Sequence, residues 1–283
     1  MFGRPILGLV GLACVVFVAT GTTAGTLDTI RESGEIKIGY RVDAAPFSYR
    51  DAKGAASGYS VDLCALVVGG IRRRLKLKTL ATKLVPVSTG DRFTAIQEGR
   101  IDLLCGATTV TLSRRAKVGF SQLIYFSGAS VMMRADGPKN FGSLRGKSIG
   151  VRGATTTERL LRATVAKSNL GARVVTIKDH LDGLKQLEGG KIDAYFADHA
   201  LLVGLLNKSA APGKLKVANQ LLSREPYALA MRRGDPDFRL AVDWSLARIY
   251  RSPAIVTVYK RNFSGRKPSK TIATLYLFNG LPD

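Results

Sequence analysis

The sequence predicts an α/β protein made of two lobes of similar construction, and two observations lead to this expectation. Short apolar segments typical of strands alternate with amphipathic segments of helical period along most of the chain. The segment at residues 98–105 is also echoed at residues 188–197. In both, a glycine closes a short amphipathic helix, Ile-Asp follows, and an apolar strand comes next. Coincidence is the alternative explanation, because glycine closes many helices.

The first part of the chain supplies most of one lobe. We expect helices at residues 27–33, 59–75 and 91–98, and strands at residues 36–39, 83–87 and 101–105. Pro46 and the glycines of residues 54–58 indicate a hairpin-like excursion between the first strand and the second helix. The apolar stripe of that helix is predicted to comprise Val61, Leu66, Val67, Ile71 and Leu75.

The second part supplies the other lobe and a return to the first. We expect strands at residues 146–151, 194–197 and 228–232, and helices from Thr155, at residues 180–187 and from Asp235. The last helix has a mixed apolar face of Leu240, Val242, Trp244, Ile249 and Tyr250. Two crossing segments, near residues 126–128 and 226–227, would form a hinge. Lobe one is therefore expected at residues 25–125 and 228–283, and lobe two at residues 126–227.

Residues 1–24 predict a secretory leader. Arg4 supplies a short positive region, residues 5–19 form an apolar run that is short for a membrane span, and Thr22-Thr-Ala24 fits a cleavage site. We expect the mature chain to begin near Gly25, with an uncleaved anchor as the alternative.

The chain is strongly basic. Its net charge is +22, and removal of the leader with Arg4 leaves +22 − 1 = +21. Such a charge suggests nucleic acid or an anionic membrane as a partner. The basic residues are spread over the whole length, however, and no run is interleaved with stacking aromatic residues. We therefore expect a solvated basic surface that attracts anionic solutes and no nucleic-acid partner; coating of an anionic polymer is the alternative.

Cysteines and histidines are few. Cys64 and Cys105 remain after cleavage, and the sequence agrees equally with a disulfide and with two buried thiols. The histidines are His180 and His199, and no Cys or His pair has the spacing of metal ligands. We expect neither a metal nor a cofactor.

Candidate binding groups gather where two predicted strands end. After the strand at residues 101–105 come a glycine, the hydroxyl of Thr109 and then Arg114, whose guanidinium can hold a carboxylate with two parallel hydrogen bonds. The strand at residues 194–197 ends at Asp198. Ligands of open α/β sheets bind outside the carboxyl ends of strands, so two such ends facing each other predict a cleft.

Short segments over nearly the whole mature chain share their order and spacing with a known family. They are Gly25-Thr-Leu-Asp-Thr-Ile, Ile38-Gly-Tyr-Arg41, Pro46-Phe-Ser-Tyr49, Gly58-Tyr-Ser-Val-Asp-Leu63, residues 105–121, Lys178-Asp-His180, Asp198-His-Ala-Leu-Leu202 and residues 275–283. They resemble the periplasmic solute-binding proteins of family 3, which feed ABC importers, and most closely the glutamate/aspartate-binding group. The resemblance implies a type II periplasmic-binding-protein fold with a two-strand hinge. It also implies a periplasmic monomer that hands an acidic amino acid to a permease in the inner membrane.

The resemblance assigns the ligand's backbone groups to particular residues. Arg114, helped by Thr109, would bind the α-carboxylate, and the helix start at Thr155 and Thr156 would add backbone N–H donors. Asp198 would accept hydrogen bonds from the α-ammonium; the alternative is an N-cap for the helix expected to begin near residue 200.

The resemblance also places the ligand's side chain. Arg41, Arg92 and His180 match basic positions of the glutamate/aspartate group, and protonation of the histidine would add a charge to a side-chain carboxylate site. Thr89 stands where a serine is usual. Ala107 also replaces a serine, so it can offer only its backbone carbonyl.

Two other functions fit the same scaffold. Some relatives of these receptors are cyclohexadienyl dehydratases, which need a pocket acid aimed at a leaving hydroxyl. The matched positions hold no carboxylate beyond Asp198, which favours a non-enzymatic receptor. Binding of another polar amino acid, such as glutamine, or of a related dicarboxylate is the second alternative.

Overall fold

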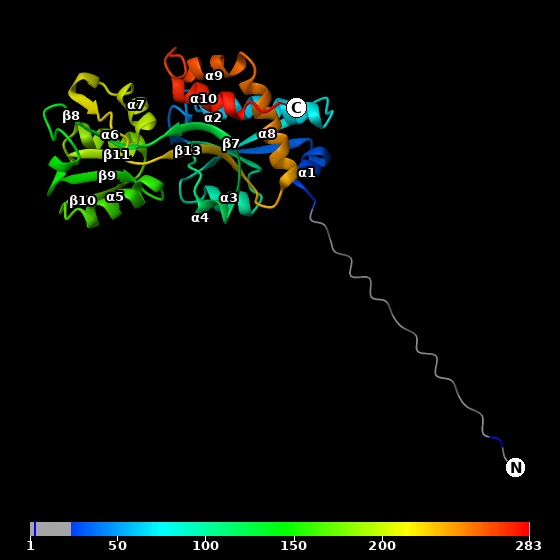
Figure 1. The fold of residues 1–283 in the computed structure, drawn as a ribbon, viewed down its shortest axis with the longest axis horizontal. Coiled ribbons are helices and arrows are strands. Elements are labelled where there is room, and N and C mark those ends of the chain that lie inside the picture. The colour runs from blue at the N-terminus through cyan, green and yellow to red at the C-terminus, as the bar shows by residue number, and fades with distance from the viewer. Residues whose placement is uncertain (1–2, 4–23, 283) are drawn as a thin grey trace.

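The computed structural model describes residue 3 and residues 24–282, so the expected leader lies almost wholly outside the described residues. Figure 1 shows two α/β units side by side, each with its own central sheet. We call the unit on the first sheet lobe one and the other lobe two. The sheet of lobe one contains, in spatial order, β5 (Ala81–Val87), β1 (Glu35–Arg41), β6 (Leu103–Cys105), β13 (Glu225–Met231) and β7 (Gly119–Ser127). The first three strands are parallel, and β13 is antiparallel to both of its neighbours.

Lobe two repeats this plan. Its strands are, in spatial order, β10 (Arg173–Ile177), β9 (Ser148–Arg152), β11 (Ala194–Asp198), β8 (Ala129–Arg134) and β12 (Leu215–Val217). Both faces of this sheet are covered. Since successive side chains of a strand point to opposite faces, β8 contributes to the core on each side. Val131 and Met133 of β8 pack with Leu161 on one face, whereas Met132 packs with Leu184 on the other.

Helices flank both sheets. Lobe one has α1 (Thr26–Ser33), α2 (Tyr59–Arg74), α3 (Arg92–Gln97), α4 (Leu112–Arg115), α8 (Pro236–Tyr250), α9 (Ala254–Asn262) and α10 (Lys270–Asn279), and lobe two has α5 (Thr156–Lys167), α6 (His180–Glu188) and α7 (His199–Leu206). A small antiparallel sheet of β2 (Asp43–Ala44), β3 (Ser48–Arg50) and β4 (Ala56–Ser57) forms the expected hairpin-like excursion. No helix among the described residues has the length and apolar character needed to cross a membrane.

The predicted apolar faces of two helices are partly wrong. On α2 the buried residues include Leu63, Cys64 and Val68, whereas Leu66 is exposed. The face turned toward the sheet is therefore rotated by about one residue from the predicted stripe. On α8, Leu240 is also exposed, at 55%. In both helices the buried face is selected by the packing of α2 and α8 against each other and against the sheet, which the periodicity of the sequence alone did not define.

The chain crosses between the lobes twice, and the two crossings lie side by side. Strand β7 leads through Gly128 into β8, and the return runs into β13, which begins at Glu225, three residues before the strand expected at residues 228–232. Ser127 and Glu225 are paired across β7 and β13. A Cβ atom at Gly128 would overlap with the carbonyl oxygen of Ser223, so the close approach of the crossings requires glycine there.

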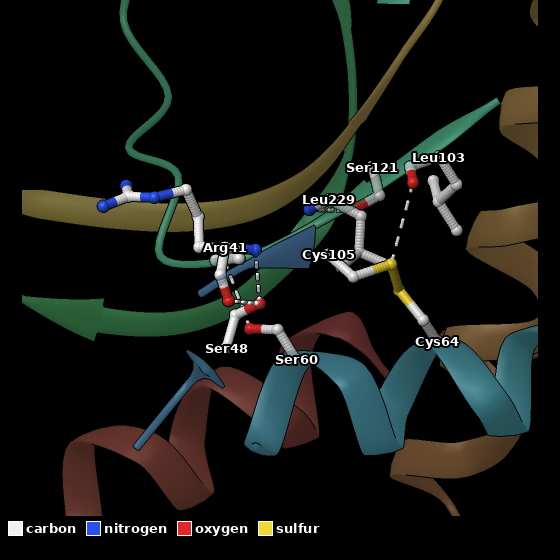
Figure 2. The surroundings of a disulfide bond; sticks show 9 residues. Arg41, Ser48, Ser60, Cys64, Leu103, Cys105, Ser121 and Leu229 are labelled. Atoms are coloured by element: carbon white, nitrogen blue, oxygen red, sulfur yellow. Dashed lines mark hydrogen bonds between the residues drawn. A yellow bond between two sulfur atoms is a disulfide. The ribbon is translucent and has the colours of Figure 1, made fainter. Parts of the chain in front are cut away.

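A disulfide ties α2 to the end of β6, which resolves the alternative left open by the sequence. Cys64 and Cys105 are bonded, with a Cα–Cα distance of 6.3 Å. Figure 2 shows the bond beside the start of α2, where Ser60 lies below the strand end that carries Arg41. The Ser60 hydroxyl donates to the carbonyl oxygen of Gly106 at 3.1 Å. The two links attach the end of β6 and the residue that follows it to α2.

Candidate ligand-binding site

A small polar cavity lies between the lobes. Its lining residues are Arg41, Ala44, Arg92, Ala107, Thr109, Arg114, Thr155, Thr156, Thr157, His180, Asp198 and Leu201. The structure thus brings together all of the residues predicted from the sequence except Thr89. That residue is buried beside the cavity, and its carbonyl oxygen accepts a hydrogen bond from the Arg92 guanidinium. Ala44, Thr157 and Leu201 were not predicted, since apolar and hydroxyl side chains carry little signal by themselves.

Lobe one contributes three buried arginines from three different elements. Arg41 ends β1, Arg92 begins α3 and Arg114 lies on α4, and each is at most 8% exposed. The guanidinium carbons of Arg92 and Arg114 lie 4.7 and 5.3 Å from the centre of the Phe93 ring. The exposed neighbour Arg115 stays at the surface.

The burial of these arginines is electrostatically costly. Loss of solvent lowers the pKa of Arg114 to about 10 and also lowers the pKa of Arg41. The pKa of Arg92 is lowered further, by burial first and then by the charges of Arg114 and Arg41. Like charges at such a site favour an anionic ligand between them.

Three buried polar atoms of the cavity residues have no hydrogen-bond partner: Nε of Arg41, Nε of Arg92 and Oδ1 of Asp198. Buried polar groups in proteins are almost always hydrogen-bonded, and each unpaired one costs about 1–3 kcal/mol. Two donors and one acceptor are therefore available to a ligand that carries both an anionic and a cationic group.

An ion-pair chain at one end of the cavity joins the lobes. Asp43 pairs with Arg41 of its own lobe, and its other oxygen lies 2.9 Å from Nε of Arg152 on β9. Burial by itself would raise the pKa of Asp43, but Arg41, His180 and Arg152 hold it at about 2. Asp43 and Arg152 were missed because the first is one residue of a short edge strand and the second lies one lobe away.

His180 lines the cavity, but the expectation of a protonated histidine is wrong. Its Nδ1 atom is hydrogen-bonded to the hydroxyl of Tyr195 at 2.7 Å. Burial lowers the pKa of His180 to about 4, and the charges of Arg41 and Arg152 act in the same direction, against Asp43. The side chain is therefore neutral near pH 7, and it offers one hydrogen bond rather than a charge.

Asp198 occupies the N-cap position of α7, yet its side chain forms no capping hydrogen bond. Its Oδ2 atom accepts a hydrogen bond from the Tyr227 hydroxyl instead, and its Oδ1 atom is free. Burial first, and then the charge of the nearby Glu225, raise the pKa of Asp198 to about 7, against the Tyr227 hydrogen bond and Arg114. The carboxyl group is directed to the cavity rather than to its helix.

The start of α5 presents backbone donors from lobe two. Thr155 is the N-cap, and its hydroxyl accepts from the N–H of Glu158, as in a capping box. The glutamate carboxylate accepts in return from the N–H of Ala154. The N–H groups of the first turn, at Thr156 and Thr157, have no acceptor within the helix. They and the dipole of the helix favour an anion at this end of the cavity.

Thr109 is engaged differently from the expectation. Its hydroxyl donates to Oε2 of Glu225 at 2.6 Å, and its carbonyl oxygen accepts from Nη1 of Arg114 at 2.8 Å. Glu225, which directly precedes the crossing expected near residues 226–227, was not predicted as a site residue. Phe47 and Tyr59 do not line the cavity; both are fully buried in the core of lobe one.

No cluster of three or more metal-ligating side chains occurs among residues 3 and 24–282. The arrangement is instead that of a binding site for an organic ion: three guanidiniums, one neutral histidine, one carboxyl group and a helix N-terminus surround a small enclosed space.

Comparison with known proteins points in the same direction. A family model for bacterial extracellular solute-binding proteins, family 3, matches residues 36–265. A glutamate/aspartate import solute-binding protein of Salmonella typhimurium is 32% identical over 248 residues, which is 87% of this chain and 82% of the relative. An L-glutamate/L-aspartate-binding protein of Pseudomonas aeruginosa is 33% identical over 255 residues, which is 89% of this chain and 84% of the relative.

Solved structures show the same fold. An ancestral arginine-binding protein bound to glutamine superposes with a TM-score of 0.73 at 22% identity, covering 82% of this chain and 99% of that one. An ancestral amino acid-binding protein described as a precursor of cyclohexadienyl dehydratase gives a TM-score of 0.72 at 24% identity, covering 85% of this chain and 100% of that one.

Proposed function

Because this chain belongs to the bacterial extracellular solute-binding proteins, family 3, we propose that it captures an acidic L-amino acid, glutamate or aspartate, for an ABC importer. The observation that carries the proposal is the cavity in which three buried arginines face one carboxyl group and leave two guanidinium nitrogens and one carboxylate oxygen unpaired. An acidic amino acid brings two carboxylates and one ammonium, so its net charge of −1 offsets the excess of cations.

The ligand's backbone groups would be held at one end of the cavity. The α-carboxylate would bind the Arg114 guanidinium from lobe one and the free N–H groups of Thr156 and Thr157 from lobe two. The α-ammonium would donate to Oδ1 of Asp198 and to the backbone carbonyl of Ala107. Because these groups come from both lobes, one ligand would hold the cleft closed.

The side-chain carboxylate would bind at the other end. Arg41 and Arg92 offer their Nε donors, and neutral His180 offers one further hydrogen bond. Thr89 supports this end indirectly, through its carbonyl contact with Arg92. A neutral side chain would leave the two buried guanidiniums without an anion, which favours acidic ligands over their amides.

The cellular location and the partner are proposed from the family. Relatives in this family act outside the cytoplasmic membrane, and we propose that this chain acts as a periplasmic monomer after cleavage of its leader. Its partner would be the permease of an ABC transporter. We propose that it is a receptor without catalytic activity.

Calorimetry on the mature chain, residues 25–283, would test the proposal with glutamate, aspartate, glutamine and asparagine. We expect one site, with affinity for the acidic ligands well above that for the amides. A ligand at about one hundred times its dissociation constant should also stabilise the fold by about 2.7 kcal/mol. Absence of both heat and stabilisation with all four ligands would refute the proposal.

One observation favours a second candidate, a dehydratase. Asp198 is buried with a pKa raised to about 7, as required of a general acid that protonates a leaving hydroxyl. Incubation of the purified protein with prephenate or arogenate decides between the two, since only an enzyme would form the aromatic product faster than a protein-free control.

A further inference from the structure

The buried hinge residue Glu225 is joined to both lobes beside the cavity. It begins β13, is 3% exposed and is paired with Ser127 of β7 at the crossing between the lobes. Its Oε2 atom accepts from the hydroxyl of Thr109 in lobe one at 2.6 Å and from the hydroxyl of Thr156 in lobe two at 2.8 Å. Its Oε1 atom accepts from the Ser223 hydroxyl at 2.8 Å.

The two threonines held by Glu225 are cavity residues on opposite sides of the cleft. Since each hydroxyl donates its single hydrogen to Glu225, neither can donate to a ligand carboxylate. The backbone N–H groups of the two threonines, in contrast, remain available to a ligand. The bridge between Thr109 and Tyr227 uses the N–H groups of Val110 and Ala228, and therefore does not involve the N–H of Thr109. Thr156 lies in the first turn of α5, where N–H groups have no helical acceptor.

We propose that Glu225 is a positioning residue for the ligand's α-carboxylate: it fixes Thr109 and Thr156 so that their backbone N–H groups, one from each lobe, converge on that carboxylate beside Arg114. The inference rests on the proposed function, because it requires a ligand with an α-carboxylate. Glu225 does not touch the ligand. It acts through the two hydroxyl groups, and these can meet on one oxygen atom only when the lobes are closed.

This role differs from that of a simple structural glutamate. A buried carboxylate near Asp198 raises the pKa of that group and so disfavours the ionised form that an ammonium needs. The hydrogen bonds that Glu225 accepts from the two lobes give this carboxylate a role at the crossing. Arg114, which faces both acids, offsets part of their repulsion.

Four variants test the proposal: Glu225→Ala, Glu225→Gln, Thr109→Val and Thr156→Val. Glutamate affinity is measured by calorimetry at pH 8, above the pKa of Asp198. We expect Glu225→Ala to bind at least about tenfold more weakly, because two hydrogen bonds that orient the donors are lost. Glu225→Gln should stay within about threefold of the parent, since its amide oxygen can accept from both hydroxyls. Glu188→Ala, which removes a glutamate that accepts one hydroxyl hydrogen bond outside the site, is the control and should bind as the parent.

A double-mutant cycle separates positioning from stability. In the Thr109→Val/Thr156→Val background, Glu225→Ala should cost almost no further affinity, because the groups through which it acts are absent. An undiminished effect in that background would overturn the proposal, as would parental affinity of Glu225→Ala or an equal loss in Glu225→Gln. If Glu225→Ala fails to fold, the glutamine and valine variants still decide.

The control on the proposed function is the parent protein. If the parent binds no amino acid, the proposed function fails, and the positioning of the α-carboxylate fails with it. If the parent binds glutamate and Glu225→Ala binds it equally well, only the inference about Glu225 fails.

Discussion

Glutamate binding should weaken as the pH falls below about 7, and Asp198 is the cause. Burial and Glu225 raise the pKa of this carboxyl group from its usual value of 3.8 to about 7, so it is protonated in the ligand-free protein at mildly acid pH. The ammonium of the ligand needs the ionised form and would lower the pKa in the complex by about 1–3 units. Binding therefore releases a proton below pH 7, and affinity falls as the pH falls.

The magnitude follows from the pKa. At pH 5.5, about 1.5 units below it, about 3% of the ligand-free protein has Asp198 ionised. With the pKa lowered by about 1–3 units in the complex, affinity should be about 8- to 30-fold weaker than above pH 8, or about 1.2–2 kcal/mol. The neutral His180, with a pKa of about 4, and the side-chain carboxylate of glutamate titrate below this range.

Calorimetry in buffers of different ionisation enthalpy, from pH 5.5 to 8, measures both the affinity and the protons released. Asp198→Asn should bind more weakly and lose the pH dependence. His199→Gln is the matched control, because His199 has a lowered pKa but lies outside the cavity lining. A flat affinity between pH 5.5 and 8 in the parent would refute the reasoning, and so would a pH dependence that persists in Asp198→Asn.

Three further predictions concern single side chains. Arg114→Ala should weaken binding of acidic ligands and their amides alike, by about 2–5 kcal/mol, because it removes the partner of the shared α-carboxylate; Arg115→Ala, its exposed neighbour, should bind as the parent in the same titrations. Arg92→Ala should weaken glutamate far more than glutamine, and an equal loss for both in a competition series would show that the side-chain subsite lies elsewhere. Reduction of the Cys64–Cys105 disulfide should lower the free energy of unfolding by about 2–4 kcal/mol in denaturant titrations, since the bond closes a loop with a sequence separation of 41; an unchanged midpoint would contradict this.

The alternation of strands and helices could be predicted well from the sequence, because most elements carry a clear period and recognisable caps. Thr155, for instance, is the N-cap of α5, at the position where the helix was expected to start. The faces of α2 and α8 were less certain, because both helices are apolar on more than one side and pack against each other. Only the tertiary contacts decide that Leu66 and Leu240 are left outside.

The lining residues of the site were predicted mainly from family resemblance, not from local pattern. Arg41 and Arg92 carry no signal that separates them from the many other basic residues of this chain. The groups missed were those that bind through long-range contacts: Glu225 is 116 residues from Thr109, and Arg152 is 109 residues from Asp43. The charge state of His180 was also inaccessible, since it depends on burial and on neighbours brought together by the fold.

The position of β13 has a consequence for how the chain assembles. This strand lies between β6 and β7 in the sheet of lobe one, yet it follows them in sequence by more than a whole lobe; Tyr227 pairs with Tyr125 and Ala230 with Leu104. Lobe two, by contrast, draws all five of its strands from one continuous stretch between β8 and β12. As the chain is synthesised from its N-terminus, lobe two can therefore fold through local contacts. The sheet of lobe one is completed only when the last sixty or so residues, which include β13, are present. During that interval β6 and β7 present open edges that can pair with other chains, until β13 inserts and the cavity acquires Glu225.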